Sequence, residues 1–242
     1  MNYREGEEPE QQFPAEAARL VEQGFRALKM RLGRYSVRRE AKVAEAVRNA
    51  VGPDIKLFCD ANAAYTLGSA LEMGEALADL DFGFFEEPLP QSPDYTGYPE
   101  LRERLPLPLA GGEALGDRKQ AQSLLERRGV DIIQPDVSLC GGIREVLFIA
   151  ELAALYGVPT ITHCWGGVVL QAATAHLLSL LPDPHWGFPT DTPLMEFDTS
   201  ENPWRTEIIN TPLELKDGFV TVPTGPGLGI EVNEAAVKRY AV

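Results

Sequence analysis

Seven polar residues lie where short apolar runs end, and their side chains are of the kinds that bind metals or move protons. They are Lys29, Asp60, Glu86, Glu113, Asp136, His163 and Glu196. Successive members are 23 to 33 residues apart, which is about the length of one strand plus one crossover helix. In a parallel α/β barrel the carboxyl ends of all strands open onto one face, where catalytic residues collect. The spacing therefore predicts that these seven side chains converge on one cavity.

Three of these residues are carboxylates at the ends of sequential strands, namely Asp60, Glu86 and Glu113. Convergent carboxylates repel one another and are costly to bury unless a cation holds them. Hard oxygen ligands without Cys or His select Mg²⁺, or Mn²⁺ as a second choice. The alternative is that each carboxylate caps a helix or is solvated, but three in register favour a metal site. Glu87 points away from Glu86 by strand alternation and is expected to be structural.

The other four residues have types suited to acid–base work. Lys29 and Arg31 share one face of their strand, so both are expected to point into the barrel as cations; the alternative is a salt-bridging surface pair. His163 and Asp136 end consecutive strands, and a carboxylate behind an imidazole fixes its tautomer and raises its basicity. A buried structural histidine is the alternative. Glu196, if protonated, could donate a hydrogen bond to an oxygen that gains charge.

Several further residues are expected to have packing roles. His176 lies inside an apolar helical pattern and His185 in a Pro-rich segment. Tyr35 and Trp165 follow strand ends and could line the pocket, although packing is the more usual role of an aromatic side chain there. The GPGLG sequence lacks the preceding strand and following helix of a phosphate-binding loop, so it is interpreted as turn chemistry.

Short apolar runs alternate with segments of helical periodicity along the chain. This alternation predicts a mainly parallel sheet, and nearly uninterrupted runs are typical of strands buried on both faces. Strands are predicted at 25–33, 55–60, 82–86, 107–111, 130–134, 159–162 and 194–197, and helices at 13–23, 36–51, 66–80, 94–103, 117–128, 143–156 and 168–181. A Pro-rich loop at 182–191 and a C-terminal tail at 198–242 complete the chain. One α/β barrel domain over residues 1–242 is expected, since such barrels have about 250 residues.

Composition narrows the possible partners. The net charge of −14 argues against nucleic acid and anionic membranes, which both need a basic surface. A small anionic substrate is compatible, because a bound divalent cation can dominate the local field. Cys59, Cys140 and Cys164 are odd in number and stand in apolar contexts, which indicates reduced thiols in a cytoplasmic protein. The chain has no apolar run of about 18 residues, and its polar first twelve residues do not form a signal peptide.

The motifs LKMR, DAN, EEP, GGE, QPD and THCWGG occur in this order and spacing, and together they resemble the enolase superfamily and within it the mandelate racemase subgroup. The resemblance covers nearly the whole chain and implies a modified (β/α)7β barrel of the TIM type. It implies Mg²⁺ held by Asp60, Glu86 and Glu113, with His163 paired to Asp136 as a base. The chemistry shared by the family is abstraction of a proton α to a carboxylate, which gives a metal-stabilised enediolate.

The resemblance also implies roles for residues around the substrate. Glu196 would face the substrate carboxylate, Asn62 matches a position near a substrate hydroxyl, and Lys29 matches the first lysine of the family's Lys-x-Lys motif. The second lysine is Arg31 here, and arginine stays protonated, so it is a poor base. A racemase needs a base on each face of the α-carbon, and His163 is the one clear base.

We therefore expect a Mg²⁺-dependent dehydratase of an acid sugar, a carbon–oxygen lyase in which His163 takes the α-proton and assists departure of the β-hydroxyl. One alternative is a racemase or epimerase of a 2-hydroxy acid in the same subgroup, with Arg31 or Lys29 as second base. Another is a truncated, inactive barrel. The family carries an N-terminal α+β capping domain and then the first barrel strand, and this sequence is expected to lack both. The open sheet edge that would result invites pairing with another chain, so a homo-oligomer is possible.

Overall fold

The computed structural model describes residues 1–91, 95–181 and 193–241. The predicted Pro-rich loop with His185 and the predicted helix start at residue 94 lie outside these ranges. The chain forms two compact units, one comprising Met1–Gly111 with Ser123–Ile132 and the other Gly112–Gln122 with Ile133–Val242. Each unit is described separately.

The first unit is built on a parallel sheet. Its strands are β1 (Ala27–Arg31), β2 (Lys56–Asp60), β3 (Phe82–Glu86) and β4 (Leu109–Gly111). They lie in the order β1-β2-β3-β4 and are followed at the same edge by β5 (Ile132–Ile133). Strand order equal to chain order, with a helical connection between strands, is the pattern of an α/β barrel wall. The predicted α/β class with a parallel sheet is therefore confirmed.

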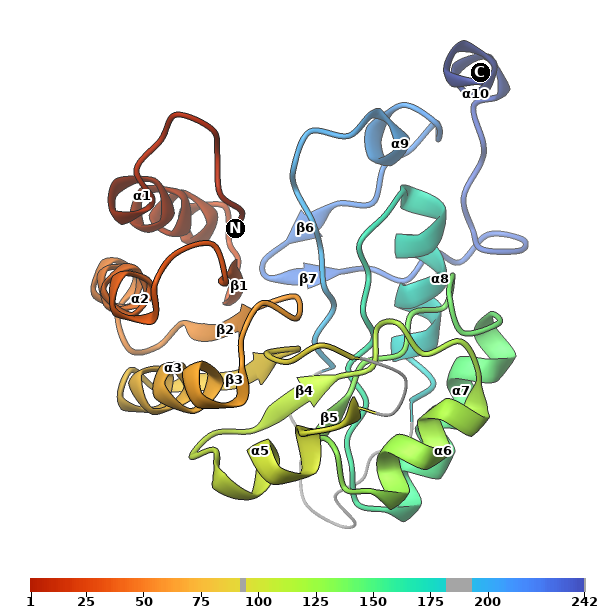
Figure 1. Cartoon of the computed structure of the whole chain (residues 1–242). Helices are drawn as coiled ribbons and strands as arrows, with labels where there is room; N and C mark the ends of the chain where they lie inside the picture. The colour runs from red at the N-terminus through yellow and green to blue at the C-terminus, as the bar shows by residue number, and fades with distance from the viewer. Residues whose placement is uncertain (92–94, 182–192, 242) are drawn as a thin grey trace. The chain divides into compact units, whose positions relative to one another are not determined.

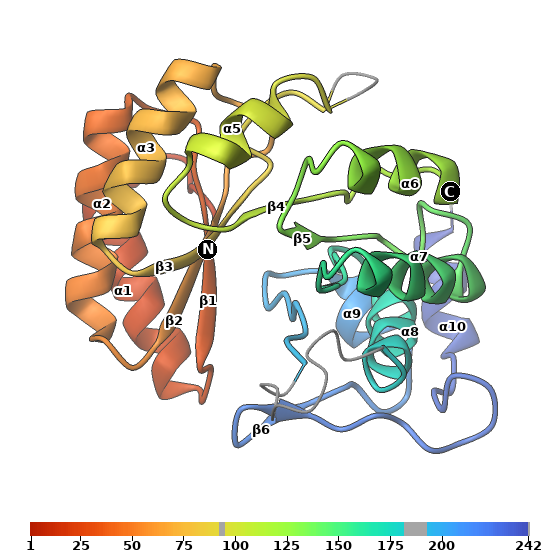
Figure 2. The same ribbon diagram turned by 90° about the horizontal axis from the view of Figure 1, so that it is seen from below.

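Helices cover one face of this sheet. They are α1 (Pro9–Glu22), α2 (Val37–Val51), α3 (Leu67–Asp79) and α5 (Tyr98–Arg104). Figures 1 and 2 show α1, α2 and α3 side by side along β1, β2 and β3. Phe13 and Ala17 of α1 and Val43, Ala44 and Val47 of α2 are almost completely buried between these layers. Their spacing of three or four residues is the helical period that the sequence predicts.

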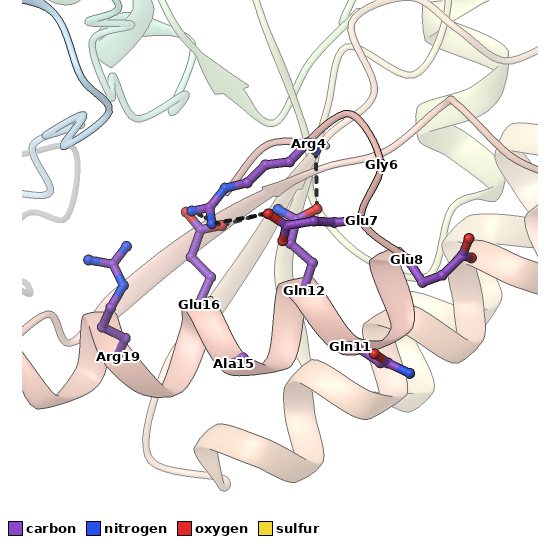
Figure 3. A pocket seen from close by; sticks show the side chains of 9 residues that line it. All are labelled: Arg4, Gly6, Glu7, Glu8, Gln11, Gln12, Ala15, Glu16 and Arg19. Carbon is purple, nitrogen blue, oxygen red and sulfur yellow. Dashed lines mark hydrogen bonds and ion pairs between the residues drawn. The ribbon is translucent and has the colours of Figure 1, made fainter.

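The N-terminal segment is fixed against both β1 and α1. The Met1 amino group donates to the carbonyl of Lys29 (2.7 Å), and the Arg31 N–H donates to the carbonyl of Met1 (3.0 Å). This is the bonding pattern of a parallel strand neighbour. A hollow of about 510 Å³ lies beside this segment. Its lining includes Arg4, which pairs with Glu16 of α1 at 3.2 Å; Figure 3 shows these side chains. The N-terminal segment therefore continues the parallel pattern at Met1.

A buried carboxylate on α2 joins three loops of the first unit. Glu40 accepts hydrogen bonds from the backbone N–H groups of residues 33–35, at 2.8 to 3.0 Å. It also accepts from the hydroxyls of Tyr3, at 2.6 Å, and Tyr65. The backbone donors lie between β1 and α2, while Tyr65 follows β2. The carboxylate thus replaces the water that would otherwise satisfy these buried groups.

The second unit contains shorter pieces of strand. Ile133 forms a parallel bridge with Thr160, and Asp136 forms one with His163. Its helical and hairpin elements are α7 (Ile143–Leu155), α8 (Val168–Leu178), α9 (Pro203–Thr206), β6 (Leu215–Lys216), β7 (Phe219–Val220) and α10 (Glu234–Tyr240). Helix α6 (Arg118–Glu126) and β5 contribute residues to both units. In both views α7 and α8 lie side by side (Figures 1 and 2).

Two expectations about this part of the chain need correction. The strand predicted at 159–162 is reduced to a bridge at Thr160, because Pro159 and, on the partner segment, Pro135 supply no N–H to the ladder on either side of that bridge. Residues 194–197 are described but form no strand, because a strand needs a backbone partner as well as apolar residues. The segment from residue 198 contains α9, β6, β7 and α10. Its Ile208 and Ile209 pack with Val168 into a small core.

All three cysteines are free and buried, as expected for reduced thiols. Burial raises the pKa of Cys59 well above its usual value, that of Cys140 to about 11 and that of Cys164 to about 12. Among the residues that the structure describes, every helix is too short or too polar to cross a membrane.

Candidate active site

The carboxyl ends of β1, β2 and β3 bring two acidic and two basic side chains together within the first unit. The register pairs Arg31 with Asp60, and Asp60 with Glu86. Lys29 Nζ contacts both carboxylate oxygens of Glu86, at 2.7 and 2.9 Å, and Arg31 Nη1 lies 2.7 Å from Asp60 Oδ2. These four residues form what is called below the charged group.

The charged group is held by compensation of charge. Asp60 is 3% exposed and Glu86 0% exposed, so either carboxylate would carry a large desolvation cost without a partner. Lys29 and Arg31, two residues apart on one face of β1, each supply one positive charge. Their place on a common face is what strand alternation predicts. Their partners are buried carboxylates, so they do not form the exposed pair that was the alternative.

The loop after β2 orients Asp60. The backbone N–H of Asn62 donates to Asp60 Oδ1 at 2.8 Å. Asn62 and Ala63 have φ values of 43° and 65°, a left-handed conformation that asparagine tolerates better than most residues. Glu87, at the start of the loop after β3, is fully buried and accepts a hydrogen bond from Gln91. A structural role for Glu87 agrees with this contact.

A second set of side chains lies in the other unit. His163 Nδ1 is 2.7 Å from Asp136 Oδ2, and the two residues are neighbours in a parallel bridge. Asp136 is 1% exposed, and its other oxygen accepts from the Ser138 N–H and hydroxyl, at 2.7 and 2.5 Å. His163 Nε2 points to Glu113 Oε2 at 3.5 Å. His163, Asp136, Ser138, Glu113 and Glu196 are called below the histidine group.

The bonds to Asp136 determine how His163 is presented. Burial by itself would raise the pKa of Asp136, but the hydrogen bonds from His163 and Ser138 outweigh burial and lower it. A charged Asp136 accepts a hydrogen bond from a proton-bearing Nδ1, so a proton is assigned to Nδ1, while Nε2 faces the Glu113 carboxylate. The imidazole is therefore oriented as a general base requires.

Two loop residues place the remaining carboxylates of the histidine group. Glu113 follows Gly112, whose φ of +118° favours glycine; a Cβ there would also lie 3.3 Å from the backbone nitrogen of Gln134. Glu196 Oε2 accepts a hydrogen bond of 2.7 Å from the backbone N–H of Cys164. Glu196 is thereby attached directly beside His163. One of its oxygens is thus occupied by a backbone amide.

The other sequence candidates have plain structural settings. His176 Nε2 contacts the carbonyl of Leu228 at 3.1 Å, which agrees with its expected structural role. The guanidinium carbon of Arg39 lies 4.1 Å from the centroid of the Tyr35 ring, so Tyr35 packs against α2. Trp165 is 64% exposed.

Sequence reasoning missed Ser138 and the Cys164 amide. Ser138 follows Asp136 by two residues, and that spacing is a signal for an Asx turn. The Cys164 amide leaves no sequence signal, because any residue except proline would supply it. The three candidate metal ligands divide between the units, with Asp60 and Glu86 in the first and Glu113 in the second.

Comparison with known proteins identifies a family and several relatives. Residues 12–236 match the family described as enolase C-terminal domain-like. D-galactarolactone cycloisomerase from Agrobacterium fabrum is 41% identical over 93% of this chain and 59% of that protein. Arabinonate dehydratase from Saccharolobus solfataricus is 34% identical over 93% of this chain and 58% of that protein.

Solved structures agree with the family match. The crystal structure of 3,6-anhydro-D-galactonate cycloisomerase from Zobellia galactanivorans has a TM-score of 0.88 at 35% identity, covering 99% of this chain and 64% of that one. An enolase from Bradyrhizobium complexed with magnesium and mandelic acid has a TM-score of 0.80 at 30% identity, over 95% and 60% of the two chains. The chain thus spans about 60% of the length of these relatives. It belongs to the enolase C-terminal domain-like family of the enolase and mandelate racemase superfamily, and its α/β fold is that of the family's barrel domain.

Proposed function

We propose that this chain is the barrel domain of a Mg²⁺-dependent acid-sugar dehydratase. The observation that carries the proposal is the His163–Asp136 pair, with Asp136 fixed by Ser138 and His163 Nε2 presented as a base. Relatives named as a dehydratase and as cycloisomerases of sugar-derived acids support this substrate class. A small carboxylate is thus the proposed substrate.

The donor set of the charged group fits a divalent cation. Asp60 and Glu86 are neighbouring buried carboxylates, and such hard oxygen donors suit Mg²⁺, with Mn²⁺ as a substitute. With Glu113 they would hold the ion. Bound Mg²⁺ would offset the negative charge on the substrate carboxylate as the α-proton leaves.

The chain's own residues would carry out the proton transfers. His163 Nε2 takes the α-proton, and Asp136 stabilises the imidazolium that forms. The same imidazolium then gives that proton to the β-hydroxyl, which departs as water while the former C–H electron pair becomes the new double bond. The enol product becomes a 2-keto-3-deoxy acid. Glu196 and Asn62 would contact the substrate.

The positive residues of β1 would act by charge in this proposal. Arg31 remains protonated and pairs with Asp60, so it supplies no second base. Lys29 contacts Glu86. A racemase or epimerase, which needs a base on each face of the α-carbon, is therefore less well supported than an elimination.

A cycloisomerase is the second candidate function. The relative at 41% identity and a structural neighbour at 35% identity carry that name. Such an enzyme would use the same base and would conserve the mass of its substrate. A dehydratase releases one water, so its product is lighter by that amount.

The test is to incubate the full chain with a panel of acid sugars and acid-sugar lactones, with Mg²⁺ or with excess EDTA. Mass spectrometry of the products separates the candidates: loss of water indicates a dehydratase, and unchanged mass with a new structure indicates an isomerase. His163→Asn is the matched control and should form no product. Absence of any product from the parent chain would contradict catalysis by this chain alone and favour an inactive or partner-dependent barrel. A homo-oligomer remains a prediction, and sedimentation of the chain would test it.

A further inference from the structure

We propose that Arg205 is a positioning residue that holds the loop after His163 and the segment carrying Glu196 in one arrangement. The proposal deepens the function proposed above, because it concerns how two residues of the histidine group are held together. Arg205 lies on α9, in the segment that sequence reasoning treated as a tail.

The guanidinium of Arg205 uses all of its nitrogen atoms to bind these two segments. Nε donates to the carbonyl of Gly166 at 2.9 Å. Nη1 donates to the carbonyls of Asp198 and Ser200, at 3.2 and 2.8 Å, and to the Ser200 hydroxyl at 3.1 Å. Nη2 lies 2.7 Å from Asp198 Oδ2. Arg205 is only 7% exposed, so these bonds are shielded from water.

Both segments bound by Arg205 lead within a few residues to the histidine group. Gly166 is three residues after His163, and Asp198 is two residues after Glu196. Each intervening residue has only two soft backbone dihedrals, so a shift of Gly166 or Asp198 passes on to these side chains. The Cys164 amide bonded to Glu196 is the second link between the two segments. Arg205 and the Cys164–Glu196 bond therefore connect the same two segments at two points, next to His163.

The geometry requires arginine and not merely a positive charge. A planar guanidinium presents its donors in fixed directions, which allows bonds to two different segments at once. The ammonium of lysine is a point charge on a flexible stem and would satisfy Asp198 or Gly166. Close backbone packing adds to the same contact: a Cβ on Gly167 would lie 3.1 Å from the carbonyl oxygen of Trp204. Helix α9 is thus seated tightly against the start of α8.

The proposal is tested by hydrogen exchange of the full chain in parent, Arg205→Lys and Gly167→Ala forms. The backbone N–H groups of Cys164 and Ser200 donate hydrogen bonds to the carboxylates of Glu196 and Asp198, respectively, and are thereby protected from exchange. In Arg205→Lys we expect both amides to exchange about tenfold faster or more, the order expected when hydrogen bonds to a charged group are lost. Gly167→Ala, which leaves the guanidinium intact and displaces α9, should give a smaller increase at the same two amides. Arg239→Lys, an exposed arginine paired with Glu207 at 3.1 Å, is the control.

The outcomes decide the proposal separately from the enzymatic activity. Faster exchange at Cys164 and Ser200, with β1, β2 and α7 unchanged, supports positioning by Arg205. Unchanged exchange at Cys164, or an equal increase throughout α7 and α8, overturns it, because the residue would then have no local effect or only a general effect on folding. If Arg205→Lys does not fold, the Gly167→Ala result decides in the same way. Where the panel yields a substrate, Arg205→Lys should lower kcat with little change in KM; a parent without activity would overturn the proposed function and leave the exchange result standing.

Discussion

The charged group and the histidine group are held in place by different means. In the charged group, four side chains extend from the ends of regular strands, and opposite charges compensate one another. In the histidine group, the side chains lie at single bridges and loops, and hydrogen bonds orient them. We therefore expect substitutions in the charged group to affect mainly stability, and substitutions in the histidine group to affect mainly catalysis.

The largest expected effect is the loss of catalysis in His163→Asn. Removal of a general base lowers turnover by roughly 10² to 10⁴-fold, whereas Asp136 keeps its two bonds from Ser138. The thermal midpoint should fall by only about 2 to 4 °C, equivalent to about 1 kcal/mol for a chain of this length. Turnover and thermal unfolding of the same preparation provide the check. A collapse of the midpoint would show that His163 is needed for folding, and the contrast would be broken.

Lys29→Met should have the largest effect on stability. It removes the Lys29 contact from the buried Glu86 carboxylate, and breaking a buried pair costs about 3 to 5 kcal/mol, with the lower end expected because the lysine is 21% exposed. Urea denaturation measures the change. The double variant Lys29→Met/Glu86→Gln removes the uncompensated charge and should recover most of the loss. Equal stability of the single and double variants would contradict charge compensation.

Magnesium should stabilise the chain through the charged group. An ion that binds only the folded state adds about 2.7 kcal/mol of stability at a concentration 100 times its Kd. The thermal midpoint of the parent should therefore rise with Mg²⁺ in the millimolar range. In Glu86→Gln, which lacks one proposed ligand, the rise should disappear. A rise that persists in Glu86→Gln would place the ion elsewhere.

Ser138→Ala tests orientation without removing a reacting group. The substitution deletes the hydroxyl bond to Asp136 and keeps the backbone bond, so it should cost about 1 kcal/mol of stability. If the missing bond mainly misorients His163, kcat should fall about tenfold. That factor corresponds to about 1.4 kcal/mol in activation free energy. Ser138→Thr keeps a hydroxyl and is the matched control. Full activity of Ser138→Ala would mean that the backbone bond alone orients Asp136.

A partly exposed ion pair outside both groups, between Arg118 and Glu145, provides the baseline and the smallest effect. Hydrogen bonds from Arg118 lower the pKa of Glu145 to about 2. A depressed pKa means that the pair stabilises the fold above pH 4.5, the ordinary value, and that this contribution fades as the pH falls from there toward 2. The stability difference between the parent and Glu145→Gln should therefore shrink over that interval. A difference that stays constant with pH would exclude the ion pair as its cause.

The contrast also explains which parts of the molecule could be predicted from sequence. The strands of the charged group were predictable because buried strands have continuous apolar runs, and alternation places Lys29 and Arg31 on one face. The pairing of Asp136 with His163 was predictable because both end consecutive apolar runs. The Glu196–Cys164 bond was not, since it uses a backbone amide that any sequence could supply.

Short elements late in the chain were also beyond prediction. Helix α9 has four residues, and its stability depends on packing and on Arg205 more than on periodicity. Its start could have been recognised from Asn202 followed by Pro203, a usual N-terminal signal. The contacts of Arg205 with Gly166 and Asp198 join residues far apart in sequence, and spacing alone gives no information about them.

The buried thiols make the two units separately observable. Cys59 lies beside Asp60 in the first unit, and Cys164 lies beside His163 in the second. A buried, protonated thiol reacts with alkylating reagents only when the surrounding structure opens, since the thiolate is the nucleophile. When opening and closing are fast, the labelling rate reports the population of the open form. Alkylation followed by mass spectrometry would therefore measure the opening of each unit separately, with Cys59 reporting on the first unit and Cys164 on the second.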